Sequence, residues 1–291
     1  MLSILRKARL GIYYCLVRLI PHNLRLKLYR HLFLRAREQN GGYSIFGGNV
    51  QRTSYGLCFK RGALQREVTA MRFVRKRTTI PVPFIVDYLV SDDNESYLIM
   101  ELILGETLAD QYGSLTEDVC RIMIRDLIDI TNELRSIPPP SRPPLVCGLG
   151  SIPIDCRRIQ LNGSSSFGPF DSVKAFHEEL IKFSNLEFPN QETESAALSK
   201  IHRLYEKPYR IVFTHNDLHP GNVMVDANFR IVGILDWESS GWMPEYWEYI
   251  KSRFVYQYRK RWGGRVMARV FPEYEEEWEV DCIYYAHRVR Y

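Results

Sequence analysis

The stretch Arg210–Glu238 contains polar residues whose types and spacing suit one kind of chemistry. His215, Asp217 and Asn222 are spaced H-x-D-x-x-x-x-N in a polar loop between two short apolar runs, and Asp236 ends a third apolar run. A carboxylate that acts on a hydroxyl group, together with two oxygen ligands for a cation, is what phosphoryl transfer from a nucleotide requires. This pattern therefore predicts a kinase that acts on a small molecule.

Each of these residues also has a plainer interpretation. Asp217 could accept a proton from a substrate hydroxyl or orient it, but lone aspartates in loops are usually turn residues. Asn222 favours the functional interpretation, because its amide oxygen can reach a metal ion that Asp217 helps to position. Asp236 is predicted as a direct Mg²⁺ ligand, with a turn-capping carboxylate as the alternative. His215 is expected to support the loop backbone or Asp236 rather than to transfer a proton.

Lys60 and Glu67 complete the predicted set from a distant part of the sequence. Lys60 ends an apolar run, and Glu67 lies in a predicted helix over 64–77, within reach of an ion pair. Such a pair would hold the ammonium group against the α- and β-phosphates of a nucleotide. A solvated strand edge is the alternative for Lys60 alone. A full glycine-rich phosphate loop is missing, and neither Gly47–Gly48 nor the turn Ser54–Gly56 is assigned phosphate contacts.

The remaining sequence indicates the elements that would position these groups. A small sheet with one inserted helix precedes a mainly helical part, in which one helix begins at a capping box of Ser114 and Glu117 and another spans 245–261. The predicted fold class is therefore α+β, with two lobes. The predicted divisions are a basic helical extension over 1–42, a nucleotide-binding lobe over 43–103 and a catalytic and substrate lobe over 104–291.

Charge is unevenly distributed along the chain. Nine of the 39 Lys and Arg lie within residues 1–37, which hold no acidic residue, so the other 30 face all 34 Asp and Glu and the remainder carries −4. An acidic body argues against a nucleic-acid-binding face, for which a broad basic patch is expected. The six cysteines are scattered, with no C-x-x-C pair. Neither a zinc site nor a disulfide framework is expected, and a reducing, cytoplasmic setting is the default.

The N-terminal segment allows two interpretations. Gly11–Ile20 is apolar, but it is interrupted by Arg18 and is too short to span a bilayer, so no integral membrane segment is predicted. Leu24, Leu28 and Leu32 continue at helical spacing, which favours amphipathic helices packed onto the fold. Mitochondrial targeting or contact with a membrane surface is the alternative that the arginine-rich, acid-free composition leaves open.

Several longer motifs resemble those of a known superfamily. THNDLHPGNVMVD is similar to the catalytic loop of the aminoglycoside phosphotransferase and choline kinase superfamily, and ILDWESSGWMPEYWEYIK is similar to its metal-binding aspartate and following helix. Shorter signatures are MRFVRKRTTIPVP, YLIMELILGETL, LRSIPPP and FGPFDSVKAF. The likeness extends over roughly 45–280 and is greatest to fungal proteins of the phosphotransferase enzyme family. It implies a protein-kinase-like fold, with a small β-sheet lobe carrying one key helix and a larger, mainly helical lobe.

The resemblance implies a role for each candidate side chain. Asp217 would be the catalytic base, and Asn222 and Asp236 would be the Mg²⁺ ligands. Lys60 would bind the phosphates of the nucleotide, and Glu67 would be its partner. The implied cofactors are ATP and Mg²⁺.

The resemblance also implies an adenine site at the hinge between the lobes. Backbone groups of Glu101 and Ile103 would contact the base. Tryptophan and glutamate follow Asp236 where protein kinases have Phe-Gly, so an activation-loop switch is not expected. Asn216 stands where relatives often have glycine, a change that could perturb the loop but leaves the chemical groups intact.

These features together predict an ATP- and Mg²⁺-dependent phosphotransferase that moves the γ-phosphate to a hydroxyl of a small molecule. A monomer or weak dimer is expected. A catalytically silent kinase-like binding protein is the alternative, because a protein can keep the fold of an enzyme without its catalytic activity. A protein kinase is disfavoured, since no clear activation segment follows Asp236.

The acceptor is harder to predict. Three acidic residues, Glu238, Glu245 and Glu248, lie among aromatic residues and could bind a cationic ligand through charge and cation–π contact. The alternative, which we favour, is that the aromatic side chains form helix core. These are Trp242, Tyr246 and Trp247.

Overall fold

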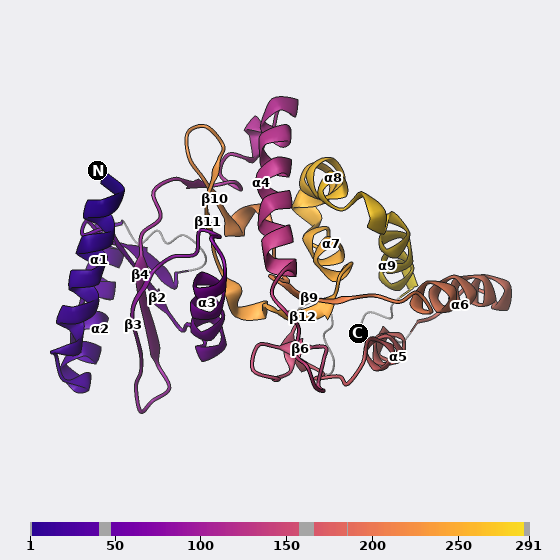
Figure 1. Ribbon diagram of the computed structural model, residues 1–291, viewed down its shortest axis with the longest axis horizontal. Helices are drawn as coiled ribbons and strands as arrows, with labels where there is room; N and C mark the ends of the chain where they lie inside the picture. The colour runs from indigo at the N-terminus through magenta and orange to yellow at the C-terminus, as the bar shows by residue number, and fades with distance from the viewer. Residues whose placement is uncertain (1, 41–47, 157–165, 185, 288–291) are drawn as a thin grey trace. The chain divides into compact units, whose positions relative to one another are not determined.

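The computed structural model describes residues 2–40, 48–156, 166–184 and 186–287. Within these residues it confirms the predicted α+β class, with a small antiparallel sheet and a larger, mainly helical part (Figure 1). The chain folds as two compact units. Unit 1 comprises residues 1–76, 81–104 and 233–238, and unit 2 comprises residues 77–80, 105–232 and 239–291.

Unit 1 is built on a four-stranded antiparallel sheet in the order β1-β2-β4-β3. Its strands are β1 (Val50–Arg52), β2 (Leu57–Arg61), β3 (Ile85–Val90) and β4 (Ser96–Glu101). β2 pairs with β4 so that Phe59 lies opposite Ile99 and Lys60 lies opposite Leu98. Because successive side chains of a strand point to opposite faces, Phe59 and Lys60 contribute to different faces of the sheet.

Helices cover both faces of this sheet (Figure 1). α1 (Leu2–Arg18) and α2 (His22–Gln39) lie on one face, and α3 (Gln65–Arg77) lies on the other. The side of α1 and α2 holds a cluster of buried apolar residues: Leu10, Tyr29, Phe33, Phe59, Val86, Leu89, Tyr97 and Ile99. The N-terminal helices are therefore packed onto the fold, as their helical spacing predicts.

A buried carboxylate also ties α2 to the sheet. Asp87 of β3 accepts hydrogen bonds from the Arg25 guanidinium and the Tyr29 hydroxyl, each at 2.7 Å. A buried carboxylate needs such partners, because burying an unpaired charge is costly. None of the helices in the described part of the chain has the length and apolar character that crossing a bilayer demands.

Unit 2 is mainly helical. Its helices are α4 (Glu117–Arg135), α5 (Val173–Ser184), α6 (Gln191–Tyr205), α7 (Trp247–Ser252), α8 (Ala268–Val270) and α9 (Glu275–His287). Its short strands are β5 (Glu106–Thr107), β6 (Cys147–Gly148), β7 (Ile154–Asp155), β8 (Ser166–Phe167), β9 (Ile211–Thr214), β10 (Val223–Val225) and β12 (Gly241–Pro244). β12 lies between β6 and β9, and β10 lies between β5 and β11 (Ile231–Ile234). The chain passes from unit 2 into unit 1 along β11.

The start of α4 differs from the sequence-based prediction. The side chain of Thr116, rather than that of Ser114, caps the helix by accepting a hydrogen bond from the Val119 amide at 3.3 Å. Ser114 ends a short 3-10 turn instead. Thr116 has the extended backbone that an N-cap residue requires.

The helix predicted over 245–261 is interrupted after α7, and a wider π-helical segment, Arg259–Met267, follows later. The Tyr112 hydroxyl explains the wider segment, since it donates to the Tyr258 carbonyl at 3.0 Å and accepts from the Trp262 amide at 3.1 Å. These two backbone groups would bond each other in a regular α-helix. A side-chain group inserted between them disrupts the helical ladder.

Candidate active site

Unit 1 brings Lys60, Glu67 and Asp236 together. Lys60 Nζ, on β2, lies 2.8 Å from the carboxylate of Glu67 on α3 and 2.9 Å from Asp236 Oδ1. The Glu67 side chain is buried and that of Lys60 is largely buried, whereas 35% of the Asp236 side chain is exposed. The ion pair expected between Lys60 and Glu67 is therefore formed, and Asp236 joins it.

A tight turn after β11 places Asp236. The Ile234 amide donates to the Pro81 carbonyl at 2.8 Å, and the buried Trp237 indole donates to the Ile234 carbonyl at 2.9 Å. Asp236 itself has φ +62°, a left-handed backbone that residues other than glycine adopt uncommonly. Backbone outliers of this kind concentrate at functional sites, where the surrounding structure holds them.

Burial and mutual charge set the ionisation of this group. Burial opposes the charge of Lys60, but the carboxylates of Glu67 and Asp236 outweigh it and raise the pKa of the ammonium group. Burial raises the pKa of Glu67 to about 7, although the charge of Lys60 pulls it down. Lys60 is therefore a cation at neutral pH and can pair with phosphate oxygens.

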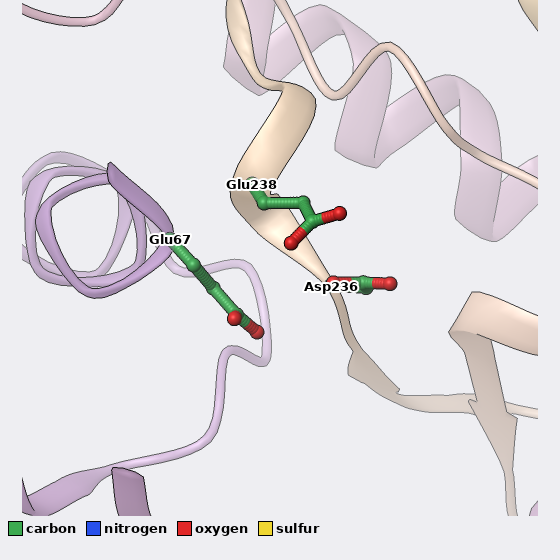
Figure 2. A group of neighbouring side chains, drawn as sticks. All are labelled: Glu67, Asp236 and Glu238. Carbon is green, nitrogen blue, oxygen red and sulfur yellow. The ribbon is translucent and has the colours of Figure 1, made fainter. Parts of the chain in front are cut away.

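Glu238 adds a third carboxylate beside Glu67 and Asp236. One ligand oxygen from each of the three residues lies within 4.8 Å of the others. Figure 2 shows Glu67 extending from α3 toward the two acids that follow β11. This donor set fits Mg²⁺, because a hard cation prefers oxygen ligands. The sequence-based prediction missed Glu238 as a metal-site candidate; the only signal was its D-x-E spacing from Asp236.

Unit 2 holds Asp217 and Asn222 in the loop between β9 and β10. Asn222 Nδ2 donates to the Asp217 carbonyl at 2.8 Å and to Asp217 Oδ2 at 3.2 Å. Since this nitrogen is bound to Asp217, the amide oxygen of Asn222 is the atom left for a cation. The buried His215 accepts a hydrogen bond from the Asp217 amide through Nδ1 at 3.2 Å, which is the loop-supporting contact expected of it.

Glu248, on α7, fixes the start of this loop. Its Oε2 accepts hydrogen bonds from the backbone amides of His215 at 2.6 Å and Asn216 at 3.2 Å. Asn216 has φ +67°, and its Nδ2 donates to the Ser239 carbonyl at 2.8 Å. Asparagine adopts left-handed backbone more readily than most residues. Asn216 thus keeps the conformation that a glycine would allow at this position.

Asp217 and Glu248 differ in how readily they ionise. Burial opposes ionisation of Asp217, but His219, Lys251 and His215 outweigh it and lower its pKa to about 2. Burial raises the pKa of Glu248 to about 7, against the effect of the two backbone amides that bind it. Asp217 is therefore ionised at neutral pH, whereas Glu248 is close to its midpoint.

The sequence suggested that three acidic residues could bind a cationic ligand, and this prediction is wrong for Glu245 and Glu248. Glu245 pairs with Arg210 at 2.7 Å, and Glu248 is buried and bound to the loop backbone. The neighbouring aromatic side chains belong to the core, which confirms the favoured alternative. These are Trp242, Tyr246 and Trp247. Helical periodicity assigns residues to a face, but it does not say which other element covers that face.

The two residues predicted to contact adenine, Glu101 and Ile103, lie at and just after the end of β4. The Glu101 amide donates to the Phe84 carbonyl at 2.8 Å, so this amide is already engaged within the sheet segment. Arg6 of α1 reaches this segment. Its guanidinium lies 2.9 Å from Glu101 Oε1 and 2.6 Å from the Leu102 carbonyl oxygen.

The two candidate phosphate-loop segments differ in what the structure describes. Gly47 lies outside the described residues. The turn Ser54–Gly56 closes the hairpin between β1 and β2, where the Thr53 amide donates to the Leu57 carbonyl at 2.9 Å and Gly56 has φ +72°. A hairpin turn explains this glycine without a bound phosphate.

The site residues of both units lie within a match to a single protein family. The model of the phosphotransferase enzyme family matches residues 49–283. The chain belongs to this family, and the resemblance drawn from its motifs is confirmed.

One curated relative is a fungal protein, the clavilactone A biosynthesis cluster protein Y of Ampulloclitocybe clavipes. It is 23% identical over 211 residues, which cover 64% of this chain and 52% of the relative. The chain thus spans about half the length of the curated relative it matches.

Solved structures share the fold at low sequence identity. A thermostable mutant of aminoglycoside phosphotransferase APH(4)-Ia, in ternary complex with AMP-PNP and hygromycin B, superposes with a TM-score of 0.54 at 14% identity, over 81% of this chain and 79% of that chain. The GDP and kanamycin complex of APH(2")-IIia gives 0.52 at 13% identity, over 88% and 90%. These likenesses confirm the predicted kinase-like fold.

Proposed function

We propose that this protein transfers the γ-phosphate of ATP to a hydroxyl group of a small molecule in a Mg²⁺-dependent reaction. The observation that carries the proposal is the contact of Lys60 with both Glu67 and Asp236, at 2.8 and 2.9 Å. Phosphoryl transfer depends on positioning and on compensating charge rather than on covalent chemistry by the protein. A buried lysine held between two acids is suited to that task.

The residues of unit 1 would hold the nucleotide. Lys60, kept cationic by its two acids, would pair with phosphate oxygens, and Glu67 would keep its ammonium group in place. Mg²⁺ bound through Asp236 and Glu238 would neutralise charge that develops on the transferred group. In unit 2, Asn222 would offer its amide oxygen to a cation. Backbone groups of the segment after β4 would meet adenine.

Asp217 would act on the acceptor. Its pKa of about 2 makes it a weak proton acceptor, so its main contribution would be to orient the hydroxyl group. The hydroxyl oxygen would bond to the γ-phosphorus as the bond to the β–γ bridging oxygen breaks, ADP would leave, and the hydroxyl proton would pass to solvent. A loose transition state needs little removal of the proton beforehand, so an orienting carboxylate is sufficient.

The acceptor class is inferred from the relatives. Two structural relatives were solved with hygromycin B and with kanamycin, and the curated relative is a biosynthesis cluster protein. These names support a small metabolite or antibiotic as the acceptor.

A screen of hydroxylated metabolites that reads ADP release tests the proposal. On an identified acceptor, Asp217→Asn should lower kcat by about 10²- to 10⁴-fold and leave the thermal stabilisation by ATP and Mg²⁺ in place. Lys60→Ala should instead weaken that stabilisation. Equal turnover by Asp217→Asn and the parent would refute the role of Asp217. If ATP with Mg²⁺ gives no stabilisation at all, the catalytically silent alternative is favoured.

A further inference from the structure

The outer face of α1 is apolar, although the helix already packs its opposite face onto unit 1 through Leu10, Tyr13 and Val17. Exposed apolar residues recur at helical spacing on the other side. We call them the outer stripe: Leu5, Ala8, Ile12, Cys15, Leu16 and, just beyond the helix, Leu19. Residues three, four or seven apart share one helix face. The stripe is therefore a continuous apolar surface.

The exposure of this surface is high. The side chains of Leu5, Ile12, Leu16 and Leu19 are exposed by 60, 57, 52 and 80%. Of the large hydrophobic side chains exposed in the described part of the chain, eight of thirteen lie within residues 5–34. Contiguous apolar patches on a protein surface mark contact with another surface.

The outer face of α2 interleaves apolar and basic residues. Its exposed leucines are Leu24, Leu28 and Leu34, and its exposed basic residues are Lys27, His31 and Arg35. Lys27 lies three positions after Leu24, and His31 lies three positions from both Leu28 and Leu34, so the two sets share one helix face. α1 and α2 cover the same face of the sheet and thus both contribute to one exposed layer (Figure 1).

The charge of this layer is not balanced by unit 1. Arg6, Arg25 and Arg30 pair with acids of the sheet segment. Among the side chains that the structure describes, five further cations have no acidic partner: Arg9, Arg18, Lys27, Arg35 and Arg37. Residues 1–37 contain nine Lys and Arg and no acid, while the rest of the chain carries −4. The surplus positive charge is thus concentrated where the exposed apolar side chains are.

We propose that α1 and α2 bind the surface of an anionic lipid bilayer and lie in its interface, with the outer stripe among the acyl chains. An apolar stripe flanked by Lys and Arg is what interfacial helices need. Anionic headgroups supply the opposite charge that this layer lacks. A symmetric contact with a second copy would instead bring the same basic helices together, since an isologous interface places one patch against itself.

Vesicle sedimentation with the full chain tests this. The protein should bind phosphatidylcholine vesicles that contain phosphatidylserine at least about tenfold more tightly than pure phosphatidylcholine vesicles. Binding should weaken as salt concentration rises, because salt screens exposed charges.

Two pairs of substitutions locate the binding surface. Ile12→Asp with Leu16→Asp removes apolar contact, and Lys27→Glu with Arg35→Glu reverses charge. Each pair should weaken binding to the anionic vesicles at least about tenfold. All four positions are exposed, so circular dichroism and the melting temperature should not change.

Matched controls lie outside the two helices. Val90→Asp with Ile152→Asp makes the same apolar-to-acid change at exposed positions, and Arg142→Glu with Lys260→Glu makes the same charge reversal. Both control pairs should bind vesicles like the parent. The proposal is overturned if the parent does not bind anionic vesicles, binds neutral ones equally, or is weakened equally by helix and control pairs. It is also overturned if sedimentation velocity shows a dimer that Ile12→Asp with Leu16→Asp abolishes, without vesicle binding by the parent.

Discussion

At the residue scale, left-handed backbone occurs in both groups of candidate site residues. Asn216 has φ +67° immediately before Asp217, and Asp236 has φ +62°. Such backbone costs an L-residue about 1–2 kcal/mol relative to right-handed conformations. Hydrogen bonds hold both loops. Asn216 donates to the Glu248 carboxylate and the Ser239 carbonyl, and beside Asp236 the Trp237 indole donates to the Ile234 carbonyl.

Asn216 allows a direct test of this strain. Asn216→Gly and Asn216→Ala both lose the hydrogen bond to Ser239, which should cost about 1 kcal/mol of the free energy of unfolding. Asn216→Ala should cost about 1–2 kcal/mol more than Asn216→Gly, because glycine adopts this conformation freely and alanine is strained in it. Urea unfolding measures both. Asn228→Ala, at an exposed loop position, is the control and should cost little. Equal stabilities of the glycine and alanine variants would contradict the strain argument.

Glu248 should make stability depend on pH. Its pKa is raised by burial from 4.5 to about 7 in the folded state, so the folded protein binds more protons than the unfolded chain between these values. Stability should therefore fall as pH rises from about 4.5 to about 7 and then level off, a contribution of order 1–3 kcal/mol. Glu248→Gln should remove this dependence when the unfolding curves of parent and variant are compared across pH.

Glu245 provides a control, because its pKa in the folded state is lowered whereas that of Glu248 is raised. Burial opposes its ionisation, but hydrogen bonds from Arg210 outweigh burial and lower its pKa. Its contribution to stability is present at neutral pH and is lost as pH falls through the folded-state pKa. Glu245→Gln should therefore flatten the acidic side of the profile. If the Glu248→Gln profile runs parallel to that of the parent, the carboxyl group of Glu248 does not titrate as stated.

At the element scale, α2 should stabilise unit 1 through its inner face alone. Phe33 is buried, and its ring packs edge-to-face on Tyr97 with centroids 6.2 Å apart. Phe33→Ala should lower the free energy of unfolding by about 3–5 kcal/mol. Leu34→Ala, one residue on and 46% exposed, should change it by less than about 1 kcal/mol. Chemical denaturation of both variants checks this, and similar losses at the two positions would be evidence against the packing of α2.

Local patterns predicted the elements that depend on neighbouring residues. The helix expected over 64–77 is observed as α3, Gln65–Arg77, because one apolar face and a proline-bounded end are local features. The π-helical segment Arg259–Met267 could not be predicted, since Tyr112 lies 146 residues from its partner Tyr258. A hydrogen bond over that separation leaves no trace in local periodicity.

The candidate site also contains residues that the sequence predicted and a residue that it did not. Lys60, Glu67 and Asp236 were proposed from residue type and strand ends, and the structure brings these three together. The role of Glu248 in holding the loop was missed. An acidic residue on a helix is predicted to face solvent, and the buried backbone amides that bind Glu248 cannot be identified from the sequence. The residues that support a loop are set by tertiary packing, whereas those that act on a ligand are marked by their chemistry.

At the scale of the whole molecule, the segment 233–238 is a short insertion of late sequence into unit 1. Ile234 in this segment is fully buried and its amide bonds to Pro81. Ile234→Ala should therefore lower the free energy of opening of β2 and β4 by about 2–4 kcal/mol, although these strands lie far away in sequence. Native-state hydrogen exchange of the amides of β2 and β4 measures this.

Val225→Ala is the matched control for that measurement. Val225 is buried on β10, which belongs to unit 2. This variant should speed exchange in unit 2 and leave β2 and β4 protected. If Ile234→Ala leaves the exchange of β2 and β4 unaltered, the segment 233–238 does not unfold together with unit 1.

The same insertion has a consequence for the order of events on the ribosome. The sheet and helices of unit 1 are encoded first, but the unit lacks Ile234 and Asp236 until residues 105–232 have been synthesised. At about 5–20 residues per second, this interval lasts on the order of ten seconds. During that time Lys60 and Glu67 can pair without their third partner. The proposed nucleotide site is therefore completed only after residue 238 has been synthesised, so a nascent chain that stops before this residue should not retain nucleotide.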